Sequence, residues 1–272
     1  MKQNREENSI VHRAKTEGLE IVSYSKGSFR SGSISIIREI PLTIFLNGIE
    51  IVTLLCIGNY SKELAVGFLR SEGMLNSLEE IGSIKFDEQR GIIEIETQGA
   101  SPIAEKLFMK RTITSGCGKG TSFYNVMDSI RCKEIRSQLK ISAKQVLRLM
   151  KELQSLSDLY KSTRGVHSSA LATPDRIVIF REDIGRHNAV DKINGECFLR
   201  GMELDDKILL TTGRITSEIL IKTGKMGIPI LISRSAPTSL AVSVARETGI
   251  TTVGYVRGGN FKIYTHSERI RD

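Results

Sequence analysis

Residues 207–250 decide the fold, and they read KILLTTGRITSEILIKTGKMGIPILISRSAPTSLAVSVARETGI. Two short apolar runs within them, KILLTTG and PILISR, have the length of buried strands. Each run precedes a segment, SEILIKTGKMG or SLAVSVARETG, whose apolar residues recur at helical spacing and which ends at a glycine. Because strands that are apolar throughout are buried on both faces, this stretch predicts a sheet covered by helices.

The same alternation extends to both sides of this stretch. Further strands are predicted at 167–174, 176–183, 251–256 and 260–265, and further helices at 142–156 and 187–201. We therefore predict an α/β domain over residues 141–272, with helices on both faces of its sheet.

The N-terminal half has a different pattern. Residues 19–57 contain short β-branched runs separated by Pro41 and by Asn47-Gly48, which predicts a small antiparallel sheet with a hairpin. Ser61 is predicted to cap a helix that ends near Gly73, and strands are predicted at 82–86 and 91–97. We expect an α+β domain over residues 19–140, preceded by a flexible polar arm at 1–18. Combined with the α/β domain at 141–272, this makes the fold class of the whole chain α+β.

Composition limits the classes of protein. The 272 residues carry a net charge of +8, and residues 141–272 hold 20 basic against 14 acidic side chains. The longest apolar stretch, residues 33–58, is interrupted by charged residues and a proline, so no membrane span is predicted. The first residues lack the apolar core of a secretory signal, so we expect a cytoplasmic protein with reduced thiols. Four widely spaced cysteines offer no paired metal-ligand pattern.

Cys117 is the best candidate nucleophile. It lies in ITSGCGKGTS, residues 113–122, among three glycines and close to Lys119. Glycines leave the sulfur little steric cover, and a nearby cation favours the nucleophilic thiolate. A flexible turn that happens to contain a cysteine is an equally good interpretation of the local sequence. Cys56 and Cys197 lie in apolar segments and are expected in the core, and Cys132 is given no role.

Three predicted junctions between a strand and a helix carry polar residues. They are residues 181–192, with Asp183, Arg186, His187 and Asn188; residues 211–218, with Arg214; and residues 233–239, with Arg234 and Ser235. Ligands of α/β sheets bind where strands end and helices begin, and helix N-termini beside arginines suit phosphate groups. Ordinary capping and local salt bridges explain each junction taken alone.

Residues 254–260, GYVRGGN, add an aromatic ring, an arginine and two adjacent glycines at a strand exit. Such a segment can stack on a base and let the backbone approach a ligand, although a plain β-turn is the competing interpretation. Together with the junctions it predicts a nucleotide-like anionic ligand. The chain has no P-loop sequence, and no GxGxxG motif at a junction of this kind.

Six ordered motifs carry a resemblance to a known family. TSGCGKG, GVHSSALA, REDIGRHNAVDK, TTGRITSE, SRSAPTSLAVSVA and VGYVRGGNFKIYT resemble the FdhD family of formate dehydrogenase accessory sulfurtransferases, over roughly residues 33–265. The resemblance implies a C-terminal domain with the cytidine-deaminase-like three-layer α/β/α fold and a smaller N-terminal α+β domain.

The resemblance also implies a function. Sulfur would pass from a cysteine desulfurase, through a persulfide on Cys117, to the molybdenum or tungsten bis-guanine-dinucleotide cofactor of formate dehydrogenase, which is bound as a substrate. The resemblance further favours a homodimer. The residues implied to bind the cofactor are Tyr255, Val256, Arg257, Gly258, Gly259 and Asn260, together with Arg186, His187, Arg214 and Ser235.

One departure keeps an alternative open. The family loop is usually Cys-x-x-Cys, whereas Gly120 occupies the second position here. A single cysteine suffices in principle for persulfide transfer. The alternative is a non-catalytic chaperone that binds the cofactor and delivers it to apo formate dehydrogenase.

Two other classes of function are disfavoured. A zinc deaminase needs His-x-Glu and Pro-Cys-x-x-Cys, whereas this chain reads His167-Ser168-Ser169 and contains no Cys-x-x-Cys, so we expect no metal site. Nucleic-acid binding is not expected, because aromatic residues are scarce and no recognised module appears.

Overall fold

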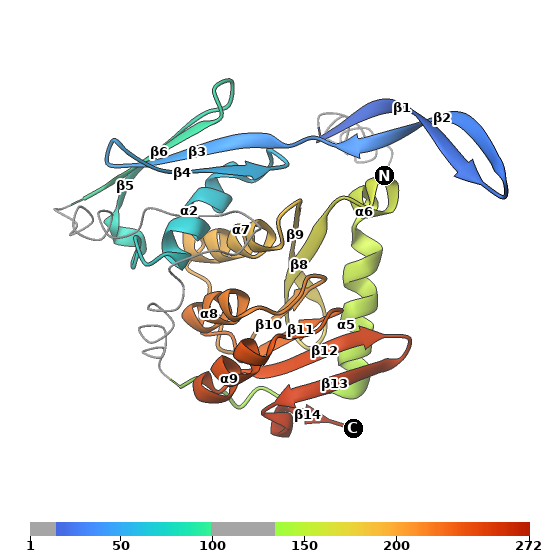
Figure 1. Ribbon diagram of the computed structural model, residues 1–272. Helices are drawn as coiled ribbons and strands as arrows, with labels where there is room; N and C mark the ends of the chain where they lie inside the picture. Colours follow the sequence, from blue (N-terminus) through green and yellow to red (C-terminus); the bar gives the residue numbers. More distant parts are fainter. Residues whose placement is uncertain (1–14, 99–133) are drawn as a thin grey trace.

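The computed structural model of the chain describes residues 15–98 and 134–272 (Figure 1). Its main sheet has the order β13-β12-β11-β10-β8-β9. Strands β10, β11 and β12 are parallel, whereas β8 and β13 run antiparallel to their neighbours. The bounds are β8 His167–Ala172, β9 Ile177–Asp183, β10 Ile208–Thr211, β11 Ile230–Ser233, β12 Thr251–Arg257 and β13 Asn260–Thr265.

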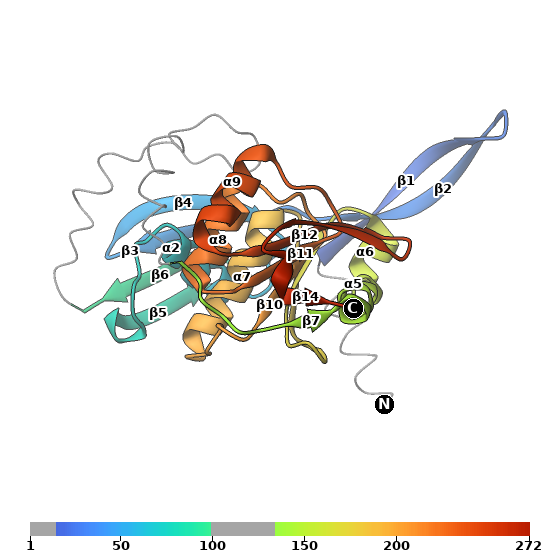
Figure 2. The same cartoon turned by 90° about the horizontal axis from the view of Figure 1, so that it is seen from below.

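Helices cover both faces of this sheet, as the sequence predicted (Figure 2). Successive residues of β10 point to opposite faces: Ile208 and Leu210 pack with α5, whereas Leu209 packs with α7, α8 and α9. A capping box of Ser142 and Gln145 starts α5. The helices are α5 Ala143–Leu156, α7 Arg186–Leu199, α8 Ser217–Met226 and α9 Ser239–Thr248.

A second sheet, of order β4-β3-β6-β5, is built from the N-terminal half. Its strands are β3 Ile40–Leu46, β4 Ile49–Cys56, β5 Ile81–Asp87 and β6 Ile92–Thr97. Asn47 and Gly48 both have positive φ, 51° and 76°, which confirms the predicted hairpin turn. Two predictions were wrong. The sheet is mixed, because β3 pairs with β6 in parallel, and Pro41 lies inside β3, next to the strand start where proline is tolerated.

Helix α2, Ser61–Ser71, joins this sheet to the rest of the molecule. It packs against α7, and the two helices cross at Gly67 and Gly195. The prediction that Ser61 caps the helix was wrong. Tyr60, with a left-handed φ of 53°, is the cap residue, and Ser61 is already helical and buried.

An antiparallel ribbon extends from the body at the start of the described chain (Figures 1 and 2). It consists of β1 Thr16–Ser25 and β2 Ser28–Ile37. The predicted polar arm is therefore wrong for residues 16–18, which belong to β1, and residues 1–14 lie outside the described part of the chain.

Short elements complete the fold. Helix α6, Asp158–Thr163, follows α5 directly, and β7, Ile141–Ser142, pairs with β14, Ile270–Arg271. Contact with the C-terminal part begins before residue 140, because the Ile135 amide donates to the Thr248 carbonyl. Single 3-10 turns occur at η1 Leu78–Glu80 and η2 Ser267–Arg269. Among the described residues, no helix has the length and apolar character needed to cross a membrane.

Candidate functional site

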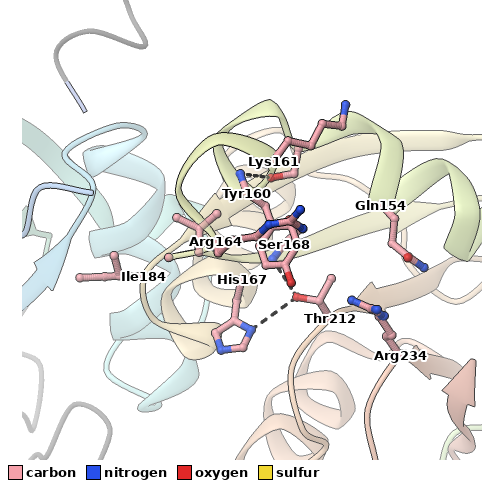
Figure 3. Close-up of a pocket in the computed structure, with 12 residues that line it drawn as sticks. Gln154, Tyr160, Lys161, Arg164, His167, Ser168, Ile184, Thr212 and Arg234 are labelled. Carbon is pink, nitrogen blue, oxygen red and sulfur yellow. Dashed lines mark hydrogen bonds between the residues drawn. The ribbon is translucent and has the colours of Figure 1, made fainter. Parts of the chain in front are cut away.

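A cavity of about 540 Å³ lies at the carboxyl edge of the parallel strands (Figure 3). The corner between α5 and α6 forms one wall, and the first residues of β8 form the floor. The loops after β9, β10 and β11 contribute Ile184, Thr212 and Arg234. Each of the three junctions identified in the sequence thus provides one residue of the lining. The volume is typical of sites for nucleotide-sized ligands.

The lining is positively charged. Lys161, Arg164 and Arg234 are lining residues, although the Lys161 ammonium is turned away from the other side chains of the site (Figure 3). No aspartate or glutamate is among the described residues that line the cavity. The Lys161 ammonium is held 2.8 Å from Asp158 and 2.7 Å from the Ser155 carbonyl oxygen. A concave site with one sign of charge attracts ligands of the opposite sign, so the cavity suits an anion.

Arg164 occupies an unusual backbone conformation at the cavity. It ends α6 with a φ of 57°, in the left-handed region that only glycine adopts without cost. Its guanidinium carbon lies 5.1 Å from the centre of the Tyr160 ring. Strained residues of this kind occur often at ligand sites. The fold therefore holds this guanidinium against the aromatic wall of the cavity.

Hydrogen bonds between neighbouring loops fix the floor of the cavity. Ser233 donates from Oγ to the Gly213 carbonyl at 2.6 Å, and the Arg234 amide donates to the Thr211 carbonyl at 3.1 Å. Thr212 accepts at Oγ1 from the Ser168 amide at 3.0 Å. The loops after β10 and β11 are therefore tied to each other and to β8, which holds Thr212 and Arg234 in place.

His167 is the titratable group of the floor. Its Nδ1 lies 3.4 Å from Thr212 Oγ1. Burial lowers the pKa of His167, and the nearby Arg186 and Arg214 guanidinium groups lower it further. The imidazole is therefore neutral at neutral pH and leaves the positive charge of the site to the arginines and Lys161.

Four residues predicted to bind the ligand, Arg186, His187, Arg214 and Ser235, lie beside the cavity and not in its lining. Arg186 packs tightly on Gly213: a β-carbon added to Gly213 would lie 2.9 Å from the Arg186 β-carbon. Within residues 15–98 and 134–272, the Nε of Arg186 has no hydrogen-bond partner. Arg214 is exposed. Ser235 accepts at its carbonyl from the Tyr255 amide at 3.1 Å.

His187 lies at the start of α7, with Nε2 3.3 Å from Glu218 Oε2. Burial, followed by the positive charges of Lys222 and Arg186, lowers the pKa of His187 to about 3. At neutral pH the contact with Glu218 is therefore one between a neutral imidazole and a carboxylate, and not an ion pair.

The predicted cofactor stretch, residues 255–260, forms the end of β12 and its turn into β13. Tyr255 has a φ of 57°, and Arg257 and Lys262 lie 5.1 Å and 5.2 Å from its ring centre. Val256 is buried in the core and presents no side chain to a ligand. Gly258 and Gly259 have positive φ between the paired residues Arg257 and Asn260. Residues 257–260 thus form the β-turn that was the alternative to a ligand-binding segment. The turn lies at the carboxyl end of β12, next to the loop that contains Arg234 and Ser235.

Asp183 and Asn188 were expected to face a pocket, and that expectation was wrong. Asp183 is fully buried and contacts Lys192 Nζ at 2.6 Å. Asn188 donates from Nδ2 to Asp183 Oδ1 at 3.0 Å and to the Leu55 carbonyl at 2.9 Å. These groups bind the end of β4 to the start of α7, so local ion pairing and hydrogen bonding explain this part of the junction.

Two of the four cysteines are described, and both are buried as predicted. Burial raises the pKa of Cys56 and raises that of Cys197 to about 12, so neither forms a thiolate at neutral pH. Cys117, Gly120 and Cys132 lie outside the described residues. Within residues 15–98 and 134–272, no group of three or more His, Cys, Asp or Glu side chains is placed to hold a metal ion.

Sequence reasoning missed the wall at the α5–α6 corner. Gln154 lies in the helix predicted at 142–156, whereas Tyr160, Lys161 and Arg164 line the cavity from residues 157–166, for which no structure or role was predicted. A signal was present, because DLYKSTRG at 158–165 places a ring and two cations directly before a buried strand. Its position at the same sheet edge as the junctions depends on the antiparallel direction of β8, which the sequence pattern did not specify.

Known proteins resemble this chain over most of its length. Residues 37–271 match the model of the FdhD/NarQ family. The sulfur carrier protein FdhD of Bacillus subtilis (strain 168) is 43% identical over 253 residues, covering 93% of this chain and 97% of that protein. That of Bacillus pumilus (strain SAFR-032) is 45% identical over 252 residues, covering 93% and 96%.

A solved structure shares the fold. It is described as that of a formate dehydrogenase accessory protein from Desulfotalea psychrophila, and it superimposes with a TM-score of 0.77 at 26% identity, over 94% of this chain and 99% of that one. This chain therefore has the same mixed α/β architecture as that solved structure. The matched family model and these relatives show that the chain belongs to the FdhD/NarQ family.

Proposed function

We propose that this protein is a sulfur carrier in the maturation of formate dehydrogenase. The observation that carries the proposal is the identity of 43% over 93% of the chain with a relative named sulfur carrier protein FdhD. The related solved structure, described as a formate dehydrogenase accessory protein, supports the same role.

Cys117 is the proposed carrier. Its thiolate attacks the terminal sulfur of a persulfide on a cysteine desulfurase, which breaks that S–S bond, forms the Cys117 persulfide and releases the desulfurase thiolate. Cys56 and Cys197 are unsuited to this step, because both are buried and have raised pKa values.

The proposed acceptor is the molybdenum or tungsten bis-guanine-dinucleotide cofactor, bound as a substrate. The cavity supports this choice, because the described residues that line it include three cations and no carboxylate, which suits a diphosphate, and because Tyr160 offers a ring for stacking. A volume of about 540 Å³ accommodates one nucleotide end of such a ligand. Delivery of the carried sulfur as sulfide needs two electrons, which a thiol reductant or the reduced metal supplies.

Binding of guanosine diphosphate, measured by calorimetry, tests the proposed ligand. Arg234→Ala is expected to weaken binding about tenfold or more, because a charge-assisted hydrogen bond is lost. The matched control is Arg90→Ala, an exposed arginine in the turn between β5 and β6 that should leave binding unchanged. Equal affinities for the wild type and Arg234→Ala would exclude the cavity as the nucleotide site.

A chaperone that carries the cofactor without moving sulfur is the second candidate, and Gly120 in place of a second loop cysteine favours it. Cys117→Ser separates the two. If the protein is a sulfur carrier, this variant should bind guanosine diphosphate normally. In cells that lack the wild-type protein, it should leave formate dehydrogenase inactive. Activation by Cys117→Ser would favour the chaperone.

A further inference from the structure

Glu182 is a buried carboxylate next to the wall of the cavity, which it does not itself line. It precedes Asp183 in β9, and successive residues of a strand point to opposite faces of a sheet. Asp183 meets Lys192 of α7, whereas Glu182 faces α5 and α6, where Ser157 donates from Oγ to Glu182 Oε2 at 2.6 Å. Burial of a carboxylate is costly unless it is hydrogen-bonded, so this contact is a specific feature of the fold.

Ser157 is the cap residue at the start of α6 and is itself buried. Its Oγ accepts from the Tyr160 amide at 3.0 Å. A hydroxyl has a single proton to donate, and an ionised carboxylate can only accept. Glu182 therefore takes the Ser157 proton, which turns a lone pair of the same oxygen toward the Tyr160 amide. Loss of the carboxylate would remove the acceptor that fixes this orientation.

Helix α6 depends on this cap because it has only six residues, and helices of that length are not stable by themselves. One turn after the cap, the Arg164 amide donates to the Tyr160 carbonyl at 2.9 Å and ends the helix. Tyr160 and Arg164 both line the cavity, and the guanidinium lies beside the ring (Figure 3). A shift at the start of α6 would therefore move both side chains.

Two lysines offset the negative charge of Glu182. Burial lowers the pKa of Lys15, and the charge of Glu182 opposes that change. Lys192 donates from Nζ to the Glu182 carbonyl at 3.1 Å. Neither lysine lines the cavity. A carboxylate beside a site for anions would repel the ligand unless cations offset its charge, so these lysines make its position compatible with the cavity.

We propose that Glu182 is a positioning residue for the ligand of the cavity. By accepting the Ser157 proton it fixes the start of α6 and, through that helix, the places of Tyr160 and Arg164. The inference rests on the proposed function, since it takes the ligand to be a nucleotide diphosphate. Glu182 is not a lining residue, so it acts through Ser157 and not by contact with the ligand. A site binds precisely only when the side chains behind its lining are themselves held in place.

Calorimetry with guanosine diphosphate on the full chain tests the effect on binding. Glu182→Leu removes the acceptor and is expected to weaken binding about tenfold. Glu182→Gln keeps an acceptor oxygen and should bind within about threefold of the wild type. Wild-type affinity of Glu182→Leu overturns the proposal, as does a Glu182→Gln variant that binds as weakly as Glu182→Leu. Circular dichroism of each variant verifies that the fold is retained.

Hydrogen exchange without ligand, measured by mass spectrometry, tests the positioning of α6 separately. Glu182→Leu and Ser157→Ala should both speed exchange of the amides in residues 157–166. The matched control is Ser71→Ala, which removes the same kind of buried bond, from Ser71 Oγ to Asp191 Oδ1 at 2.6 Å. It should leave exchange in residues 157–166 and the affinity for guanosine diphosphate unchanged.

The two measurements distinguish the two ways in which the account can fail. A wild type that binds no guanosine diphosphate contradicts the proposed ligand of the cavity. Unchanged exchange of residues 157–166 in Glu182→Leu overturns the positioning role, whatever the cavity binds.

Discussion

The Lys192 ammonium and the Asp183 carboxylate lie 2.6 Å apart, and both side chains are fully buried. Lys192 also donates to Asn59 Oδ1 at 2.7 Å and to the Glu182 carbonyl at 3.1 Å. Asp183 further accepts from the Gly185 amide at 3.2 Å. The pair joins β9 to α7. The bond from Lys192 to Asn59 ties this pair to the chain that leaves β4, so it anchors one half of the molecule to the other.

Lys192→Met is expected to lower the free energy of unfolding by about 3–5 kcal/mol, because it leaves Asp183 as a buried charge without its partner. Urea denaturation measures the loss. Lys62→Met, at an exposed position of α2, is the control and should change stability by less than about 0.5 kcal/mol. A loss equal to that of the control would show that the pair does not hold the two halves together.

The crossing of α2 and α7 gives a second prediction. A β-carbon on Gly67 would lie 1.8 Å from the Asp191 carbonyl oxygen, so Gly67→Ala forces the helices apart. We expect a loss of about 3 kcal/mol in urea denaturation, as for other overpacked cores. Gly18→Ala, where no atom lies within 4 Å of the new β-carbon, should be neutral. Wild-type stability of Gly67→Ala would contradict the close approach.

His187 gives a prediction for acidic pH. Its folded pKa of about 3 lies below the ordinary value of 6.5, so the unfolded chain binds the proton first as the pH falls. Its contribution to stability is therefore present above about pH 6.5 and is lost as the pH falls toward 3. His187→Gln should lose less stability than the wild type between about pH 7 and pH 4.5, by roughly 1–3 kcal/mol. Parallel pH profiles for the two proteins would show that His187 does not titrate as described.

Much of the fold was predictable from local patterns. The alternation of strands and helices between His167 and Thr265 follows from short apolar runs and glycine-terminated helices, and the turn at Asn47-Gly48 follows from backbone preferences. These features depend on neighbouring residues alone. The parallel pairing of β3 with β6 was not predictable, because it joins strands about fifty residues apart in the chain.

The site was predictable only in outline. The junctions at Thr212 and Arg234 reach the cavity because parallel strands end at one edge of a sheet. Asp183 and Asn188 are also polar residues at a junction between a strand and a helix, yet they face the interior, since α7 packs against both β9 and the end of β4. Local sequence does not distinguish a polar side chain that meets a ligand from one that pairs with a buried partner on a distant segment.

Mass spectrometry of the Cys117 peptide, after incubation of the full chain with a cysteine desulfurase and sulfur-labelled cysteine, tests the central claim most directly. The proposal predicts one labelled sulfur atom on Cys117, removable by a thiol reductant, and no label on Cys56 or Cys197, whose burial raises their pKa values. Cys117→Ala should then carry no label. An unlabelled Cys117 beside an active desulfurase, or normal labelling of Cys117→Ala, would contradict the assignment of this residue as the sulfur carrier.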